Sequence, residues 1–204
     1  MSSRRLLIAT GSRHKLAELR ALLALSATEL LGLADLGLAD DADETGSTFE
    51  DNATIKARHY AALSGLPTLA DDSGLEVDAL GGRPGVATRR YAGPDATDEQ
   101  NNAKLLAELS GVPPAQRTAR YRCVLVLVEE RDVTAVTRGT FEGRIALEPR
   151  GSGGFGYDPV FEPADEPVGG RTVGELSLDE KNRRSHRTVA ARAMRDVLLS
   201  RGYG

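Results

Sequence analysis

The sequence predicts a mixed α/β fold in which helices flank a central sheet. Short apolar runs alternate with amphipathic stretches along most of the chain, which is typical of strands alternating with helices. Two apolar runs, 124–128 and 133–136, lie on either side of a polar turn and predict a hairpin. A hairpin within such alternation favours a mixed rather than a purely parallel sheet. No repeat or disordered linker interrupts residues 1–204, so we expect one α/β domain.

The first elements follow from apolar periodicity. Residues 6–9 predict a buried strand, residues 10–14 a loop and residues 15–25 a helix. After an acidic, loop-like stretch at 40–46, a second helix is expected to run to about residue 63. Leucines at helical spacing supply the apolar stripe of the first helix: Leu16, Leu19, Leu22 and Leu23.

Capping signals and chain breakers place the remaining elements. Ser47 and Glu50 have the spacing of a capping box at the start of the second helix, and Thr97 and Gln100 repeat that spacing further on. A strand over 66–72 is expected to stop at the turn residues Ser73 and Gly74. Beyond them come two glycine-rich loops and a last helix, at 81–85, 151–158 and from about residue 185.

Composition and charge narrow the class of function. With 40% hydrophobic and 27% charged residues, the chain has the composition of a globular domain. Its net charge of −4 provides no basic field for a nucleic-acid backbone, so we expect no nucleic-acid partner. The single cysteine, Cys123, lies in an apolar run and predicts a buried thiol. The apolar run at 6–9 is too short for a signal peptide or a membrane span, and we expect a cytoplasmic protein without a membrane partner.

Two adjacent carboxylates, Asp71 and Asp72, close the predicted strand at 66–72. Acids at a strand exit are costly unless a cation or hydrogen-bond donors satisfy them, and ligands of α/β sheets bind at such exits. An ordinary solvated turn is the alternative, because Asp, Ser and Gly are common turn residues. Side chains alternate along a strand, so the two acids should not point the same way.

A candidate phosphate site lies where the first strand meets the first helix. Unpaired N–H groups and the positive end of the helix dipole suit anionic oxygens there. A lysine at a helix start opposes that dipole, so Lys15 favours an anion between it and the N–H groups. The alternative is an ordinary surface junction, and the Walker A spacing is absent. The residues of this junction are Thr10, Gly11, Ser12, Arg13, His14 and Lys15.

The acidic stretch offers candidate ligands for a hard cation. If its Asp43 and Glu44 fold near Asp72, their oxygens can share one Mg²⁺, which prefers a few carboxylates with waters and phosphates. Asn52 and Lys56 lie on one polar stripe of the helix that follows. A solvated acidic loop is the alternative.

Aromatic and basic residues in the last third suit a nucleobase. In the glycine-rich loop, Phe155 or Tyr157 offers a flat face, although Tyr157 has the alternative of pinning the loop to the core. Lys181, His186 and Arg187 add donors close to the last helix, for which the alternative is a solvated basic helix start.

Taken in order, these motifs resemble the inosine/xanthosine triphosphate pyrophosphatases, over almost the whole chain. The resemblance implies two lobes with the active site in a cleft between them, a homodimer, and Mg²⁺ as cofactor. It also implies hydrolysis of ITP, dITP or XTP to the monophosphate and pyrophosphate, which removes deaminated purines from the nucleotide pool. The matching segments are 9–15, 44–53, 70–75, 155–159 and 185–187, with connecting loops at 80–86 and 89–93.

The same resemblance implies roles for single residues. Asp72 would be the proton acceptor and a metal ligand, and Glu44 or Asp43 would complete the metal site. The triphosphate would lie on residues 10–15, and Ser73 would contact the substrate. Further substrate contacts are expected from Lys56, Phe155, Gly156, Tyr157, Asp158, Lys181, His186 and Arg187.

Two residues depart from the pattern. Ser12 stands where the family usually has Asn, and His14 where it often has Gly, so their individual contacts do not carry over. The nearest rival is a Maf-type pyrimidine or modified-nucleotide pyrophosphatase, against which Lys15 and the loop at 155–158 argue. A nucleotide-binding regulator without catalysis is a rival of another class, and the intact acids argue against it.

Overall fold

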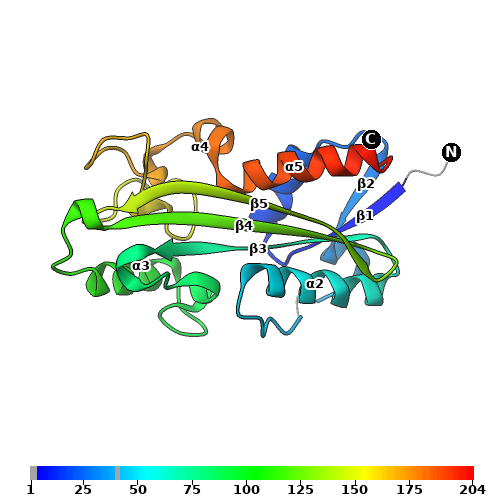
Figure 1. The fold of residues 1–204 in the computed structure, drawn as a ribbon, viewed down its shortest axis with the longest axis horizontal. Helices are drawn as coiled ribbons and strands as arrows, with labels where there is room; N and C mark the ends of the chain where they lie inside the picture. The colour runs from blue at the N-terminus through cyan, green and yellow to red at the C-terminus, as the bar shows by residue number, and fades with distance from the viewer. Residues whose placement is uncertain (1–3, 40–41) are drawn as a thin grey trace. The chain divides into compact units, whose positions relative to one another are not determined.

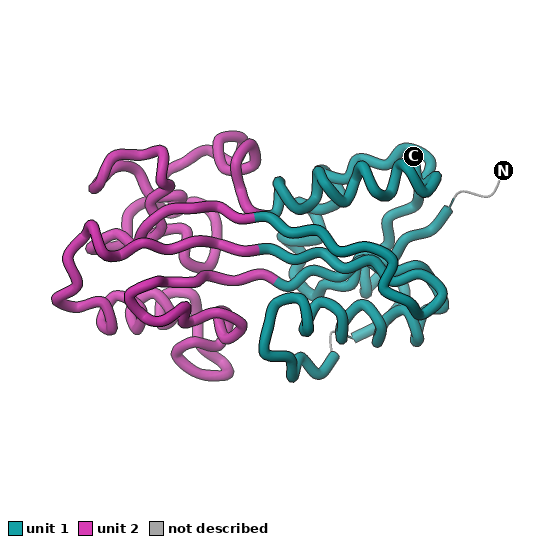
Figure 2. The backbone as a smooth tube through the Cα atoms, viewed as in Figure 1, with its two compact units in different colours: residues 1–72, 123–139, 187–204 teal, residues 73–122, 140–186 magenta. Residues whose placement is uncertain are grey.

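The computed structural model describes residues 4–39 and 42–204, which form two compact units. Unit 1 comprises residues 1–72, 123–139 and 187–204, and unit 2 comprises residues 73–122 and 140–186 (Figure 2). Two units agree with the two lobes that the resemblance implies. The single domain over 1–204 and the cleft stay predictions.

The strands form one sheet in the order β2-β1-β3-β4-β5-β6 (Figure 1). β1 pairs in parallel with both β2 and β3, whereas β5 and β6 are antiparallel. The predicted mixed sheet and the hairpin of β4 and β5 are therefore confirmed, while the short strands β2 and β6 were not predicted. Their bounds are Arg4–Ala9 (β1), Thr28–Gly32 (β2), Thr68–Val77 (β3), Thr118–Glu129 (β4), Asp132–Ile145 (β5) and Phe161–Pro163 (β6).

In unit 1, helices cover both faces of the strands. α1 (Arg13–Leu23) and α5 (His186–Ser200) bury leucine and alanine side chains against β1, β3 and β4 in one core cluster. α2 (Phe49–Ser64) lies on the opposite side of the strands from α5 (Figure 1). Cys123 is fully buried in the core cluster, so the predicted buried thiol is confirmed, and burial raises its pKa to about 12.

The start of α2 differs from the prediction by one residue. Thr48 is the N-cap, and its side chain and that of Asp51 form the capping box. Ser47 and Glu50 were therefore the wrong pair. Both pairs consist of a hydroxyl residue followed three residues later by an acid, so the sequence alone does not distinguish them. In the helix that forms, Phe49 is buried in the first turn.

The prediction that β3 stops at Ser73 and Gly74 is wrong. β3 runs on to Val77, and its later side chains Leu75 and Val77 are fully buried in the core of unit 2. Alternating burial of these apolar side chains favours a continued strand over a turn. Asp71 and Asp72 consequently lie within a strand, where unit 1 ends, and not at a strand exit.

Unit 2 contains the helix α3 (Asp98–Glu108) and the short helix α4 (Leu178–Arg184). The predicted capping box of Thr97 and Gln100 is confirmed at the start of α3, and Leu105 and Leu109 are fully buried. α4 was not predicted, because the sequence placed only one last helix, from about residue 185.

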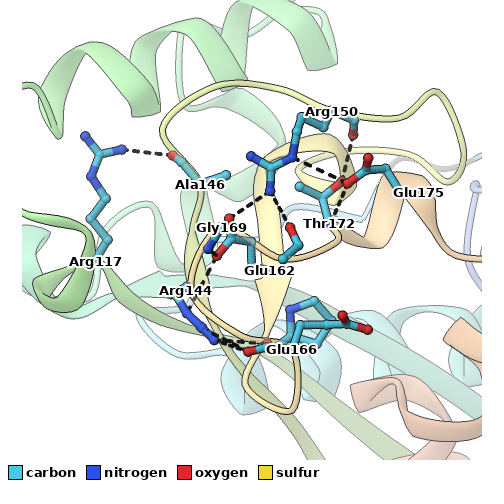
Figure 3. A network of polar contacts seen from close by, with 11 residues as sticks. Arg117, Arg144, Ala146, Arg150, Glu162, Glu166, Gly169, Thr172 and Glu175 are labelled. Atoms are coloured by element: carbon cyan, nitrogen blue, oxygen red, sulfur yellow. Dashed lines mark hydrogen bonds and ion pairs between the residues drawn. The ribbon is translucent and has the colours of Figure 1, made fainter.

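A network of charges holds the segment that carries the glycine-rich loop (Figure 3). Just before that loop, the Arg150 guanidinium donates to the buried Glu162 carboxylate at 2.8 Å and lies 3.5 Å from that of Glu175. The Thr172 hydroxyl donates to the Arg150 carbonyl at 2.7 Å. The start of the loop is therefore tied to residues of unit 2 that follow the loop in the chain.

No helix among residues 4–39 and 42–204 is long and apolar enough to cross a membrane. The described residues do not include the N-terminal residues 1–3. They also leave out Asp40 and Asp41, the first two residues of the predicted acidic stretch at 40–46.

Candidate active site

Asp71 and Asp72 point to opposite faces of β3. The Asp71 carboxylate meets cations from α1 and α5, whereas the Asp72 carboxylate accepts a hydrogen bond from Asn52 on α2. This is the alternation that the sequence predicted for two neighbours in a strand.

Asp71 is fully buried between cations. Its Oδ2 lies 3.0 Å from the Lys15 ammonium and 3.8 Å from the Arg187 guanidinium. Burial disfavours the charged carboxylate, but the charges of Lys15, Arg187 and Lys56 outweigh burial and lower the pKa of Asp71 to about 2. Asp71 is thus an anion at every physiological pH and holds two cations in place.

Asp71→Asn is expected to lower the free energy of unfolding by about 2 kcal/mol at pH 7, because the pKa of Asp71 falls from 3.8 to about 2 on folding. A lowered carboxyl pKa contributes stability that is present above pH 3.8 and is lost as the pH falls toward 2. Denaturant unfolding of the wild type and the variant at pH 7 and pH 2 measures this difference. A difference that does not shrink at pH 2 would contradict the assignment.

Asp72 has the opposite electrostatic character. Its Oδ2 accepts from the Asn52 amide at 3.2 Å, and the side chain is largely buried. Burial is the main cause that raises the pKa of Asp72 to about 6, and the charges of Glu44 and Asp71 add to the rise against Lys15 and Lys56. A carboxyl that titrates near neutrality is suited to accept a proton during a reaction.

The predicted phosphate junction lies at the start of α1. Ser12 is the N-cap and accepts from the Lys15 backbone N–H at 3.4 Å, while Thr10 accepts from the Ser12 N–H at 3.3 Å. An anion does face Lys15, but it is the Asp71 carboxylate of the protein itself. Arg13 and His14 are exposed. A pocket of about 290 Å³ opens here, lined by Thr10, Gly11, Arg13, Leu16, Leu33, Ala34 and Leu38.

The acidic loop reaches α2 through Glu44. The Glu44 carboxylate forms an ion pair with the buried Lys56, whose ammonium also donates to the Asp71 carbonyl at 3.3 Å. Asp43 accepts from the Thr45 N–H through its carbonyl. Within residues 4–39 and 42–204, no three His, Cys, Asp or Glu side chains gather as a metal-binding group. Glu44 lies close enough to raise the pKa of Asp72, so these two carboxylates are the pair that a divalent cation would neutralise.

In unit 2, the glycine-rich loop is built around Asp158. This buried carboxylate accepts from the Phe155 backbone N–H at 2.9 Å and from the Lys181 ammonium at 2.7 Å. The Lys181 ammonium lies 4.2 Å from the centre of the Phe155 ring. Gly154 has a φ of +76°, and a Cβ on it would lie 2.0 Å from Asp158 Oδ2, so this close turn requires glycine.

The two aromatic residues of the loop have different environments. Tyr157 is only 2% exposed in the core of unit 2, and its hydroxyl donates to the Thr88 carbonyl at 2.8 Å. Its ring pins the loop to the core, whereas Phe155 is only half-buried. Gly156 is held from both sides by α3, because its N–H donates to Asp98 and its carbonyl accepts from Asn102.

His186 and Arg187 are neighbours in sequence with different surroundings. The His186 ring stacks on Tyr121 in unit 2, with centroids 4.9 Å apart. The Arg187 guanidinium lies in unit 1, where it donates to Glu18 at 2.5 Å and faces Asp71. Sequence reasoning missed Glu18 and Tyr121, since a Glu in a helix and a Tyr in a strand are ordinary there.

A family model described as the Ham1 family matches residues 6–197. The chain belongs to the Ham1 family. Every residue discussed above as a candidate site residue lies within the matched range.

Named relatives cover nearly the whole Ham1-family chain. A dITP/XTP pyrophosphatase of Shigella flexneri is 47% identical over 196 residues, which is 95% of this chain and 98% of the relative. One of Methylococcus capsulatus is 50% identical over 190 residues, 92% of each protein. The resemblance drawn from the sequence motifs is therefore confirmed.

Solved Ham1 structures share this fold. A HAM1 protein from Coxiella burnetii matches with a TM-score of 0.87 and 42% identity, covering 97% of this chain and 99% of that one. The Staphylococcus aureus Ham1 protein matches with a TM-score of 0.86 and 35% identity, covering 97% and 100%. The mixed sheet with flanking helices is thus the fold of the Ham1 family.

A larger hollow of this Ham1-family protein, about 700 Å³, lies away from the acids. Arg4, Pro67 and Tyr203 are among its lining residues, and none of the predicted site residues is. It opens where β1 and β3 begin, whereas Asp71 and Asp72 lie further along β3. Size alone therefore does not indicate the candidate active site.

Proposed function

We propose that this protein hydrolyses deaminated purine nucleoside triphosphates, namely ITP, dITP and XTP, to the monophosphate and pyrophosphate. The observation that carries the proposal is the Asp72 carboxyl, a buried acid with a pKa of about 6 beside Glu44, Lys15 and Lys56. Relatives that cover nearly the whole chain bear the name dITP/XTP pyrophosphatase, which supports the same activity.

The residues of unit 1 suit the phosphates. Lys15 and Lys56 bring two ammonium groups beside the acids, and the N-terminus of α1 directs backbone N–H groups toward the junction at residues 10–15. We propose this junction as the binding site for the triphosphate, and Ser73, the first residue of unit 2, as a further substrate contact. Lys15 is held by Asp71, which fixes its ammonium for that task.

Asp72 and Glu44 are the proposed ligands for Mg²⁺. Their donors are hard oxygens, and Glu44 contributes to the raised pKa of Asp72, so the pair fits a divalent cation. Glu44 is preferred over Asp43 because its carboxylate pairs with Lys56 beside the acids. When bound, Mg²⁺ neutralises phosphate charge and lowers the pKa of a coordinated water.

The proposed step is attack of water on the α-phosphorus. A new oxygen–phosphorus bond forms, the bond to the bridging oxygen of the β-phosphate breaks, and pyrophosphate leaves. Asp72, a buried carboxylate beside the substrate site, takes the proton of the water. Lys15 and Lys56 offset the charge that develops on the phosphate oxygens.

The residues of unit 2 suit the base. Phe155 offers a ring face beside Lys181, and His186, which stacks on Tyr121, is proposed as a further donor. A 6-oxo purine presents an acceptor where adenine presents an amino donor, so donors of the protein leave adenine mismatched. Arg187 remains a proposed substrate contact, although its guanidinium is engaged by Glu18 and Asp71. Gly156 and Asp158 are proposed to shape the loop.

We further propose that residues 1–204 act as one catalytic domain and that the protein is a cytoplasmic homodimer. Its net charge of −4 supports a nucleotide rather than a nucleic acid as the partner. Size-exclusion chromatography with light scattering tests the dimer.

A panel of nucleoside triphosphates with Mg²⁺ tests the activity, with pyrophosphate and orthophosphate measured separately. We expect pyrophosphate from ITP, dITP and XTP, and kcat/KM at least 10²-fold lower for ATP, since an unpaired polar group in a built site is strongly rejected. Orthophosphate alone, or equal turnover of ATP and ITP, would contradict the proposal. Turnover of pyrimidine nucleotides instead would favour the Maf-type alternative, and binding without turnover would favour a regulator.

A further inference from the structure

The Asn52 side chain connects two parts of the candidate active site in unit 1. It lies in the first turns of α2 and is only 1% exposed. A buried carboxamide must find partners for both its oxygen and its nitrogen. Its contacts therefore show what the residue is doing there.

The two partners of Asn52 fix the orientation of its amide. The Gly46 backbone N–H donates to Asn52 Oδ1 at 2.8 Å, and Asn52 Nδ2 donates to Asp72 Oδ2 at 3.2 Å. An N–H requires an acceptor, and a carboxylate requires a donor, so reversing the amide would lose both bonds. Few side chains offer a donor and an acceptor at this separation without adding charge.

The Gly46 contact holds the loop that carries Glu44. A Cβ on Gly46 would lie 2.7 Å from Asn52 Oδ1 and 2.5 Å from Asp51 Cβ, so the loop approaches α2 too closely for a larger residue. One helical turn later, Lys56 pairs with Glu44. α2 thus anchors the loop at two points, through Asn52 and through Lys56.

We propose that Asn52 is a positioning residue that sets the Asp72 carboxylate and the Glu44 loop as one unit. The inference rests on the proposed function, in which Asp72 is the base and both acids bind Mg²⁺. Asn52 acts through these residues and contacts neither the substrate nor the metal ion. Residues that orient metal ligands in this way typically change metal affinity or activity 10- to 100-fold when replaced.

The test compares Asn52→Ala with Asn101→Ala. Asn101 is a matched control in unit 2, because it is 2% exposed and clamps a loop by accepting from Ala92 N–H at 2.8 Å and donating to the Arg89 carbonyl at 3.1 Å. Both replacements remove a buried carboxamide with two partners. Only Asn52 touches a proposed base and metal ligand.

Two measurements are made on each folded variant. Mn²⁺, which prefers the same hard oxygen ligands as Mg²⁺, is titrated without nucleotide and followed by electron paramagnetic resonance. Separately, kcat and KM for ITP are measured at saturating Mg²⁺. For Asn52→Ala we expect Mn²⁺ affinity and kcat each to fall about 10- to 100-fold, with KM for ITP within about threefold of the wild type. Asn101→Ala should leave the Mn²⁺ affinity within about twofold, as no metal ligand contacts it.

Wild-type Mn²⁺ affinity and kcat in Asn52→Ala would overturn the proposal, and so would equal losses in Asn101→Ala. Asn52→Asp separates the two contacts, because it keeps an acceptor for Gly46 and removes the donor to Asp72; wild-type kcat in this variant would also overturn it. If Asn52→Ala does not fold, Asn52→Ser gives the same comparison. The panel on the wild type reports failure of the proposed function independently, since the Mn²⁺ titration contains no nucleotide.

Discussion

Asp72→Asn is expected to lower kcat for ITP by 10²- to 10⁴-fold, the usual contribution of a general base. Asparagine has the size of aspartate but accepts no proton at neutral pH, and it supplies a weaker oxygen ligand to Mg²⁺. At saturating Mg²⁺ the KM for ITP should change little, because Lys15, Lys56 and the junction at residues 10–15 remain. Such a change removes an interaction made mainly in the transition state.

Steady-state kinetics with pyrophosphate detection measure the effect. Asp78→Asn is the matched control, because Asp78 directly follows β3 in unit 2 and forms an exposed pair with Arg120 at 2.8 Å. That control should keep kcat within about twofold, as for most surface changes. A kcat for Asp72→Asn within tenfold of the wild type would remove Asp72 from the role of base.

The same variant is expected to unfold less readily. Folding raises the pKa of Asp72 from 3.8 to about 6, so its ionised form costs about 3 kcal/mol at pH 7. This cost is present above pH 6 and disappears as the pH falls toward 3.8. Asp72→Asn should therefore raise the free energy of unfolding in metal-free buffer at pH 7 and lose that advantage near pH 4. A loss of stability at pH 7 would contradict the pKa assignment.

Lys181→Met is expected to destabilise the protein by about 3–5 kcal/mol, the usual cost of removing one partner of a buried ion pair. Lys181 and Asp158 are 8% and 4% exposed and lie 2.7 Å apart. Without the ammonium, the Asp158 carboxylate remains buried with the Phe155 N–H and the Tyr121 hydroxyl as its partners. The Phe155 ring also loses its cation, so KM for ITP should rise.

Denaturant unfolding and ITP kinetics measure both effects. Arg171→Met is the matched control, because Arg171 pairs with Glu180 at 3.0 Å but is 49% exposed, and exposed pairs contribute at most about 1 kcal/mol. Adding Asp158→Asn to Lys181→Met should restore part of the stability, since no buried charge then lacks its partner. A double variant less stable than the single one would contradict this reading.

Local sequence signals predicted much of the fold. The capping box of Thr97 and Gln100, the hairpin of β4 and β5, and the strand β1 all depend on residues that are close in sequence. Local sequence could not decide whether Ser47 or Thr48 is the N-cap of α2, because each is followed three residues later by an acid. Burial of Phe49 is a tertiary property and accompanies the capping box that forms.

The candidate site was predicted in part. Its residues were recognised from motifs, but the different environments of residues close in sequence were not predicted. Tyr157 lies in a core whereas Phe155 does not, and His186 and Arg187 belong to different units. Sequence spacing predicts which way a side chain points from its strand or helix. It does not predict which other element that side chain will meet.

Asp71 and Asp72 show which properties the sequence determines and which depend on the tertiary structure. The sequence by itself determined that two acids follow an apolar run and that strand alternation directs them to opposite faces. Only the tertiary structure decided that β3 continues past them, that Asp71 meets Lys15 and Arg187, and that Asp72 meets Asn52. The physical reason is that the charge state of a carboxyl depends on its burial and on its distances to charged groups from distant parts of the chain. Two adjacent aspartates therefore differ in pKa, which is about 2 for Asp71 and about 6 for Asp72.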